Sequence, residues 1–479
     1  MKFSSKFISE DEQDLIHHET VRILKDVGIK FNGRKALPLL EKHGALVDWD
    51  SRIVRFPVEL IDEALSFAPE SFILGARNPL YNFPLPSPVS RYCIDGTASF
   101  TLDSKTGQKR YGTLQDIEDG LRILQSLDMG VMAWAPTVAN DTPPNSRVLH
   151  EFFGLIKSTS KHGQHEVHHP GQIPFLIEGL SAVLGSEDAV RENKNYSLIY
   201  CPVAPLMHDG DMLDAYLELG KWNLPVMILP MPVNGSTGPA SLFSNMCLAN
   251  AETLSSIIVF ELENPGRPMI YSSATGSIDF RNGAYLAGTP EMALQSAALV
   301  TMGRYYNLPS TSAGCSSDAK EPGAEAVLDK LITTIPPVSA GADIIIGFGE
   351  IDGDQLLVLE QLIVDNEIAH LCERLHSGID AGETKNLFDD ISKVGPGGHF
   401  LASKHTRLAA RSNEFFMSDL IDRHPYQSWM ELGKPGMYKN ARDRVKEILD
   451  GPFVDPLTDN VISDLDHILK RADAALAKD

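Results

Sequence analysis

Eight short apolar runs between Arg91 and Glu350 constrain the fold of this chain more than any other feature. Each run ends in polar or aromatic residues, precedes a helix-like stretch, and begins 30 to 43 residues after the previous one. That interval accommodates one strand, one helix and two short loops, the repeat of a parallel β/α unit. We therefore predict an α/β fold, a closed (β/α)8 TIM barrel, with ligands bound at the carboxyl ends of its strands. The runs begin at residues 91, 129, 162, 196, 226, 269, 309 and 343.

The segments outside these runs divide the chain into three parts. A minimal barrel leaves about 200 of the 479 residues to flanking elements. Residues 1–88 form an N-terminal extension of helices and strands, and Ser9 is the expected cap of its first helix. Residues 89–378 hold the barrel. Residues 379–479 form a helical extension that we expect to pack on the barrel or to mediate self-association.

The charge of the chain limits its partners. With 42 basic and 64 acidic residues, the net charge of −22 would repel nucleic acids and anionic membranes. The start, MKFSSKFISEDEQ, lacks the apolar stretch of a secretory signal, and no apolar run reaches 18 residues, so we expect a cytoplasmic protein. Five dispersed cysteines without a CxxC pair predict neither a disulfide framework nor a structural zinc site.

The third run, HGQHEVHH, gathers four histidines around one glutamate. Such a cluster suggests zinc or iron, but a strand alternates its faces, so His162, His165 and His168 cannot all point the same way. A metal site would need further ligands, for which Asp318 and Glu350 after the seventh and eighth runs are candidates. A metal-dependent barrel hydrolase is therefore one alternative, although we expect no metal.

Lys320 follows the seventh run in the segment SSDAKEPG. A lysine near a barrel mouth can form a Schiff base, pair with a carboxylate such as Asp318, or bind an anionic substrate group, and we favour the two non-covalent roles. The segment GFGEIDGD after the eighth run is acidic and would repel phosphate. This argues against a cofactor or substrate held by its phosphate.

Aromatic side chains lie near most of the predicted strands. Aromatic faces attract quaternary ammonium groups, by up to about 2 kcal/mol each when the pair is desolvated. The alternative is that these rings fill the core, which is the more common fate of a single aromatic residue. The residues concerned are Tyr92, Trp134, Tyr200, Tyr271 and Phe348.

Several stretches resemble the trimethylamine methyltransferase superfamily, the corrinoid-dependent enzymes of methylotrophic archaea and many anaerobic bacteria. They span nearly the whole chain in the order of the family. They are HHETVRILKDVGIKF, LLEKHGALVDWDSRIVRFPVELIDEAL, KHGQHEVHH, SSDAKEPGAEAVLDK and VGPGGHFLASKHT. The resemblance implies transfer of a methyl group to Co(I) of a corrinoid that a separate small protein carries.

The archaeal trimethylamine enzymes of this superfamily insert pyrrolysine after the seventh strand, at a position that corresponds to about Leu328 here. Leucine cannot replace pyrrolysine, so the resemblance implies the non-pyrrolysine branch, which includes enzymes that demethylate glycine betaine, proline betaine and carnitine. A quaternary ammonium is already cationic and loses a neutral amine, so it does not require the activation that pyrrolysine would give to a tertiary amine. We expect glycine betaine as the substrate and dimethylglycine as the product, with the other betaines as alternatives.

The expected site follows from this hypothesis. Without a catalytic base, the barrel would orient one N-methyl group in a site that excludes water. We expect Tyr92, Tyr200, Tyr271 and Phe348 around the ammonium group. Among the candidate carboxylate ligands His165, Lys320, Arg304 and His399, we favour His165 and His399. The corrinoid protein should dock on the rim around the strand ends, and the helical tail suggests a homo-oligomer. A non-catalytic protein that sequesters osmolytes is the remaining alternative.

Overall fold

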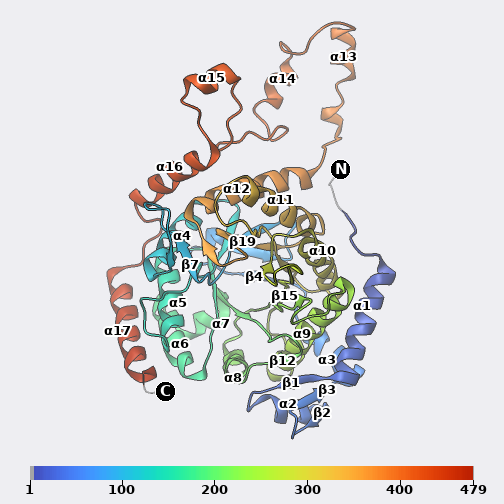
Figure 1. Cartoon of the computed structure of the whole chain (residues 1–479), viewed down its shortest axis with the longest axis vertical. Coiled ribbons are helices and arrows are strands. Elements are labelled where there is room, and N and C mark those ends of the chain that lie inside the picture. The colour runs from blue at the N-terminus through green and yellow to red at the C-terminus, as the bar shows by residue number, and fades with distance from the viewer. Residues whose placement is uncertain (1–4, 478–479) are drawn as a thin grey trace.

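The computed structural model describes residues 5–477 and contains the predicted barrel (Figure 1). Its eight parallel strands begin within two residues of the predicted positions, so this prediction is confirmed. Seven pairs of neighbouring strands form a continuous sheet, and a parallel bridge between Tyr271 and Ser310 joins its two edges. In order around the barrel, the strands are β6 (Arg91–Ile94), β9 (Gly130–Ala133), β10 (His162–His165), β11 (Tyr196–Tyr200), β13 (Val226–Ile228), β15 (Met269–Tyr271), β18 (Thr311–Ala313) and β19 (Ile344–Phe348).

One long helix follows each barrel strand and covers the outside of the sheet. Thr113 begins the first of these helices with a capping box, as its sequence predicts. The fifth, α9, is long and apolar enough to cross a membrane, but 78% of its most apolar window is buried in the protein core. The helices are α4 (Leu114–Ser126), α5 (Arg147–Ser158), α6 (Ile173–Leu184), α8 (Gly210–Leu219), α9 (Leu242–Glu263), α10 (Pro290–Tyr305), α11 (Ala324–Ser339) and α12 (Leu359–Ser377); α7 (Glu187–Asn193) is additional.

The N-terminal extension is a small α+β lobe against α9. Ser9 caps its first helix through a capping box with Glu12, as predicted. One strand of the lobe's sheet comes from the barrel. This strand is β12 (Met207–His208), which lies in the loop after β11 and pairs in parallel with β1. The other elements are α1 (Glu10–Arg22), β1 (Ile29–Phe31), α2 (Ala36–Lys42), β2 (Leu46–Asp48), β3 (Ile53–Arg55) and α3 (Val58–Phe67).

A hairpin closes the amino end of the barrel. It consists of β4 (Phe72–Leu74) and β5 (Phe83–Leu85). The carbonyl of Gly75 lies 2.7 Å from Nδ1 of His162 at the start of β10, and the N–H of Asn78 donates to the carbonyl of Ser160. Solvent is thereby excluded from this end.

Two small sheets lie at the opposite, carboxyl end of the barrel, because their strands belong to loops that follow barrel strands. The first combines the loops after β6 and β19, and the second combines the loops after β13 and β15. Their strands are β7 (Phe100–Leu102), β8 (Lys109–Tyr111), β20 (Glu350–Ile351) and β21 (Leu356–Leu357), and then β14 (Val233–Asn234), β16 (Gly276–Ile278) and β17 (Tyr285–Leu286).

The C-terminal extension falls into two unlike parts. Residues 379–436, which we call the arm, leave the barrel after α12 and project away from it (Figure 1). The chain then returns, so that α16 packs against α4 and α12, and α17 packs against α5 and α6. The bounds are α13 (Phe388–Val394), α14 (Lys404–Ala409) and α15 (Tyr426–Glu431) in the arm, followed by α16 (Met437–Asp450) and α17 (Asp459–Leu476).

Candidate functional site

Three carboxyl groups gather where β6 and β19 end side by side. Asp95 follows β6 directly, while Glu350 and Asp354 lie in the loop after β19. Burial raises the pKa of Asp95 to about 6, although the N–H of Gly96 and the charge of Lys330 lower it. Burial, together with the charge of Asp95, raises the pKa values of Glu350 and Asp354 well above their usual range. Each acid therefore makes ionisation of the others more costly.

These acids lack a cation of their own. Glu350 is fully buried, and neither of its carboxyl oxygens has a hydrogen-bonding partner among residues 5–477. The nearest cation, Lys330, is committed elsewhere, because its Nζ donates to Asp365 at 2.9 Å and to the carbonyls of Cys315 and Gly347. Burial lowers the pKa of Lys330, but the charge of Asp365, the hydrogen bond to that carboxylate and the nearby Cys315 and Asp354 together hold the pKa above its usual value. The cluster thus keeps a surplus of potential negative charge.

Backbone strain accumulates in the same loops. Thr97 after β6, Cys315 after β18, and Asp352 and Asp354 after β19 all have positive φ values, between 56° and 68°. A β-branched residue such as threonine rarely adopts this conformation. Strain of this kind is concentrated at ligand sites, where the surrounding structure holds it in place.

A pocket of about 280 Å³ lies next to the acids. Thr97, which follows Asp95 in the same loop, lines this pocket together with residues of β10 and of the segments after β9 and β10. Nε2 of His165 lies 3.1 Å from the Glu151 carboxylate, whereas its buried Nδ1 has no hydrogen-bonding partner in the described chain. His168 pairs with Glu166 at 2.7 Å, which raises the pKa of His168 above its ordinary value. Arg147 completes the polar lining. The pocket therefore holds Arg147 and two histidines, together with the carboxylates of Glu151 and Glu166 that pair with those histidines.

The aromatic residues expected around an ammonium group lie elsewhere. Tyr92 and Phe348 are stacked with ring centroids 4.7 Å apart, and Tyr92 lies beside Cys372 of α12. The hydroxyl of Tyr200 bonds to His208 at 2.8 Å, and that of Tyr271 donates to Asn250 of α9 at 2.9 Å. All four rings are buried, and Tyr200 and Tyr271 meet neither each other nor the first pair. These contacts place the rings between the sheet and its outer layer.

Trp134 does lie at the mouth. Its indole ring covers Gly96, where a Cβ atom would come within 2.0 Å of the ring, so only glycine fits. The indole Nε1 is buried without a hydrogen-bonding partner among the described residues. Trp134 is thus buried against the residue that follows Asp95.

Two of the candidate carboxylate ligands are separated from the mouth. Arg304 lies at the amino end, where its Nη2 donates to Asp343 just before β19. His399 is exposed on the arm, which leaves the barrel from its amino end because α12 runs back from the mouth. His399 is therefore remote from the carboxyl-end site within this chain.

Lys320 stays at the rim of the mouth. Its side chain is 72% exposed and forms an ion pair with Asp352 at 2.7 Å, and it donates to the backbone carbonyl of Asp318. The Asp318 carboxylate itself accepts the N–H groups of Ala287 and Gly288. Lys320 therefore pairs with the carboxylate of Asp352 and not with that of Asp318, the partner that the sequence suggested.

Leu328, the position matched to pyrrolysine, is 59% exposed on α11. Its neighbours in the chain point the other way, because Asp329 accepts a hydrogen bond from Ser317 and Lys330 is fully buried. A side chain at Leu328 faces away from the mouth.

The histidines of β10 diverge as a strand requires. His162 bonds to Ser197 at 2.8 Å, and burial lowers the pKa of His162 to about 4. His165 points to α5 instead, and His168 extends to Glu166. Among residues 5–477 no three histidine, cysteine or acidic side chains converge on a point where they could hold a metal ion. The hydrolase alternative therefore lacks the ligand set on which it depends.

Sequence reasoning missed four residues of this site: Asp95, Asp354, Arg147 and Glu151. A signal for the first two existed, because Asp95 directly follows the run RYCI and Asp354 lies in the acidic segment GFGEIDGD. Both segments were predicted strand ends, where acids from neighbouring strands meet. Arg147 and Glu151 stand on α5 and carry no comparable signal in the sequence.

Comparison with known proteins agrees with this fold. A family model described as trimethylamine methyltransferase (MTTB) matches residues 3–477. Trimethylamine methyltransferase MttB of Methanosarcina barkeri is 30% identical over 477 residues, covering 97% of this chain and 94% of the relative. MttB of Desulfitobacterium hafniense is 28% identical over 465 residues, covering 97% and 93%. A glycine betaine methyltransferase of Desulfitobacterium hafniense is 30% identical over 457 residues and covers 94% of both chains.

A solved structure supports the fold alone. The hydroxylamine complex of MtmB superposes with a TM-score of 0.51 at 10% identity, covering 94% of this chain and 89% of the other. The full-length match to the family model and the relatives at about 30% identity carry the assignment. The chain belongs to the trimethylamine methyltransferase family, as the motifs of its sequence predicted.

Proposed function

We propose that this protein moves a methyl group from a quaternary amine, with glycine betaine as the first candidate, to a corrinoid carried by a partner protein. Family membership makes the chain a methyltransferase for methylated amines. The relatives described above are named for trimethylamine and for glycine betaine, two compounds that share a methylated nitrogen. The step from this class to a quaternary amine rests on the chemistry of the mouth.

The observation that carries the proposal is the group of buried carboxyls at the mouth without a free cation. Asp95, Glu350 and Asp354 resist ionisation because burial deprives them of water. A quaternary ammonium group has no N–H to donate, so it is held by charge and by aromatic or apolar surface. The acids supply the charge, and the indole of Trp134 supplies the surface. A cation in the mouth would favour ionisation of these same carboxyls.

The chemistry of such a substrate makes few demands on the protein. When the N–CH3 bond of a quaternary amine breaks, its electron pair stays on nitrogen and a neutral tertiary amine leaves. No proton has to be added or removed, so the acids act on the charge and orientation of the substrate. Holding one methyl group in line for attack, in a cavity that excludes water, is the main contribution of the barrel.

Glycine betaine differs from trimethylamine by an additional carboxylate. We assign this carboxylate to the pocket of Arg147, His165 and His168, which adjoins the acids through Thr97. The raised pKa of His168 favours its cationic form, and the free Nδ1 of His165 can donate when that nitrogen carries the proton. We thus retain His165 from the sequence hypothesis and add Arg147.

The corrinoid must approach from the rim, because the amino end is closed by the β4–β5 hairpin. When docked, it would supply Co(I) as the nucleophile for the methyl carbon. The rim suits a broad, partly apolar ligand, since Val203, Met231 and Phe280 are exposed on the loops after β11, β13 and β15. These side chains would also exclude water once a partner covers them.

An anaerobic reaction with cob(I)alamin tests the proposal. The purified protein is mixed with glycine betaine, and dimethylglycine formation and cob(I)alamin consumption are followed together, with the cognate corrinoid protein added in a parallel series. We expect conversion that requires both protein and betaine. Conversion of proline betaine or carnitine instead would keep the reaction and change the substrate.

Two results would overturn the proposal. Tight binding of betaines without any conversion, even with the corrinoid protein present, would indicate an osmolyte-binding protein. Stoichiometric zinc or iron, retained through purification without chelators and required for a hydrolytic activity, would revive the hydrolase alternative.

A further inference from the structure

The arm lacks a hydrophobic core of its own. Of residues 379–436, only Leu420 is buried. Isolated segments of this kind do not bury enough apolar surface to offset the entropy of ordering them. Nine large apolar side chains of the arm are more than half exposed, which marks a surface that a partner covers. They are Ile379, Phe388, Ile391, Leu401, Leu408, Phe415, Met417, Tyr426 and Leu432.

The middle of the arm is also basic, in contrast to the rest of the chain. Residues 391–413 contain Lys393, Lys404, Arg407 and Arg411 and no acidic residue, within a chain whose net charge is −22. The side chain of Arg407 is exposed and forms no ion pair within residues 5–477. This stretch therefore combines exposed apolar groups with four uncompensated positive charges.

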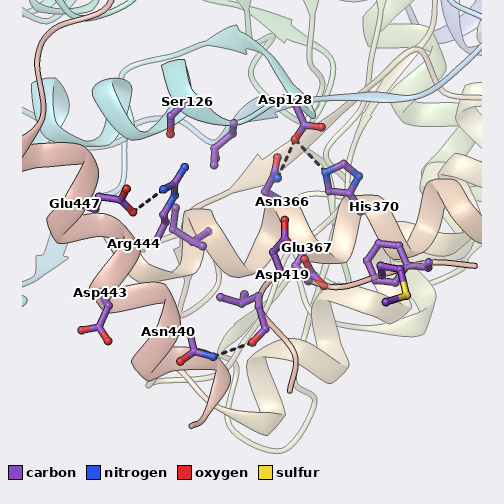
Figure 2. Close-up of a pocket in the computed structure, with 15 residues that line it drawn as sticks. Ser126, Asp128, Asn366, Glu367, His370, Asp419, Asn440, Asp443, Arg444 and Glu447 are labelled. Carbon is purple, nitrogen blue, oxygen red and sulfur yellow. Dashed lines mark hydrogen bonds and ion pairs between the residues drawn. The ribbon is translucent and has the colours of Figure 1, made fainter. Parts of the chain in front are cut away.

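A groove of complementary character lies where the arm joins the barrel (Figure 2). It measures about 830 Å³ and is bounded by α12, α16, the loop before β9 and residues 416–420. Its carboxylates outnumber its guanidinium groups by five to one. The acids are Asp128, Glu367, Asp419, Asp443 and Glu447, opposed by Arg444, and the apolar lining comprises Leu127, Ile363, Phe416, Met417 and Leu420.

Some of these acids are free to accept a new cation. Figure 2 shows Arg444 paired with Glu447 and Asp128 bonded to Asn366 and His370. No such pair engages Glu367 or Asp443 within the described part of the chain. The groove therefore offers negative charge beside apolar surface, which is the counterpart of residues 391–413.

We propose that residues 391–413 of one copy of this chain lie in the groove of a second copy. The charges favour this occupant, since the basic stretch of the arm meets the acidic groove of an otherwise strongly acidic protein. The groove lies at the root of the arm, so a two-fold axis would let both copies exchange arms at once. The contact then closes as a symmetric dimer and leaves no free end for further growth.

The geometry favours exchange over folding back. The part of the arm that contains residues 391–413 is fixed at both ends, because Arg374 of α12 donates to the carbonyls of Gly378 and Glu414. Asn440, which lines the groove, holds the carbonyl of Leu420. The intervening segment projects away from the body (Figure 1). It is thus placed to contact a neighbouring molecule.

Sedimentation velocity of the full-length protein over a wide concentration range tests this proposal. We expect a dimer for the wild type. Leu401→Glu, Arg407→Glu and Asp443→Lys should each raise the dimer dissociation constant about tenfold or more. The double variant Arg407→Glu with Asp443→Lys should recover most of that loss, because it restores opposite charges with exchanged signs. Lys30→Glu, on an exposed lysine of the N-terminal lobe, is the matched control and should leave the dimer unchanged.

Three results would overturn the proposal. A monomer at all concentrations would exclude the exchange and would indicate that the arm folds back on its own groove or waits for another protein. Strictly additive losses in the double variant would exclude the pairing of arm and groove. A wild-type monomer whose Arg407→Glu variant requires more corrinoid protein for half-maximal turnover would assign the arm to that partner. Unchanged far-ultraviolet circular dichroism checks that each variant is folded.

Discussion

The two ends of the barrel treat their buried charges in opposite ways. At the amino end, Asp343 accepts hydrogen bonds from Arg304 and from the N–H groups of Ser87 and Ser310. Lys161 there donates to three backbone carbonyls at the end of α4 and the start of β9. At the carboxyl end, neither carboxyl oxygen of Glu350 has a hydrogen-bonding partner among the described residues. The amino end satisfies these buried charges, and the carboxyl end leaves Glu350 available.

This difference separates stability from function within one sheet. A satisfied buried charge fixes the ends of several elements. An unsatisfied buried charge destabilises the free protein, and a ligand of opposite charge that pairs with it stabilises the complex. Natural barrels place their ligand sites at the carboxyl end, where loops vary without disturbing the closure of the sheet. We therefore expect substitutions at the two ends to have opposite effects on stability and activity.

Asp343→Ala should have the largest effect on stability. The substitution leaves Arg304 and two backbone N–H groups without their acceptor in a buried site, which costs about 3–5 kcal/mol. Urea unfolding followed by tryptophan fluorescence measures the loss. The protein that remains folded should keep its affinity for substrate, and a variant that unfolds like the wild type would contradict the assignment of stability to this end.

Asp354→Asn should reduce activity without destabilising the fold. It removes a charge that a cationic substrate needs, and we expect kcat/KM to fall about 100-fold, as for other electrostatic groups of active sites. Asparagine tolerates the positive φ at this position and does not have to ionise in a buried site, so stability should be unchanged or greater. Turnover at saturating corrinoid protein and urea unfolding are measured on the same preparation. Unfolding of this variant would place Asp354 among the structural residues.

The pH dependence of substrate affinity should follow the ionisation of the Asp95 carboxyl group. Because burial raises its pKa to about 6 from an ordinary value of 3.8, the free protein loses stability as pH rises through this interval and the carboxyl ionises. A cation binds the ionised form, so its affinity should increase up to about tenfold per pH unit below pH 6 and level off above it. Titration calorimetry at several pH values measures this. Asp95→Asn should abolish the dependence, and an unchanged slope in that variant would assign it to another group.

His165→Ala tests the carboxylate pocket. We expect KM for glycine betaine to rise about tenfold, because one hydrogen bond to a charged group is lost. Trimethylamine and other amines without a carboxylate provide the comparison, since their binding should not change. Equal losses for both kinds of compound would mean that His165 shapes the site and does not contact the carboxylate.

Lys320→Ala should have the smallest effect. Its ion pair with Asp352 lies at the exposed rim, and such pairs contribute about 0–1 kcal/mol. We expect activity within about twofold of the wild type. A large loss of turnover with the corrinoid protein, but not with free cobalamin, would instead assign Lys320 to docking.

The sequence predicted the barrel well because its signal is repeated. Most of the strands are apolar, each following helix is amphipathic or buried, and eight repeats at similar intervals support one another. The direction of single side chains carries no such support. A parallel strand covered on both faces is apolar at every position, so the sequence does not indicate which residues face inward. Tyr92, Tyr200 and Tyr271 were expected at the mouth for this reason, and their contacts place them under the helices.

The loops limited the prediction of the site in another way. His165 was predicted because four histidines share one strand end, and Trp134 was noted because it directly follows β9. Asp95 and Asp354 are distant in sequence and meet only because β6 and β19 close the barrel. The arm was expected to be helical, but its separation from the body depends on missing contacts, which no local pattern encodes.

The pairing of β1 with β12 has a consequence for the order in which the protein is made. Residues of the N-terminal lobe leave the ribosome first, yet the strand that completes their sheet ends at His208, and the ring of His208 stacks on Phe31 with centroids 4.4 Å apart. Until that distant strand emerges, β1 has an open edge and Phe31 lacks its cover. The first part of the chain to be synthesised therefore reaches its final form only after almost half of the translation is complete.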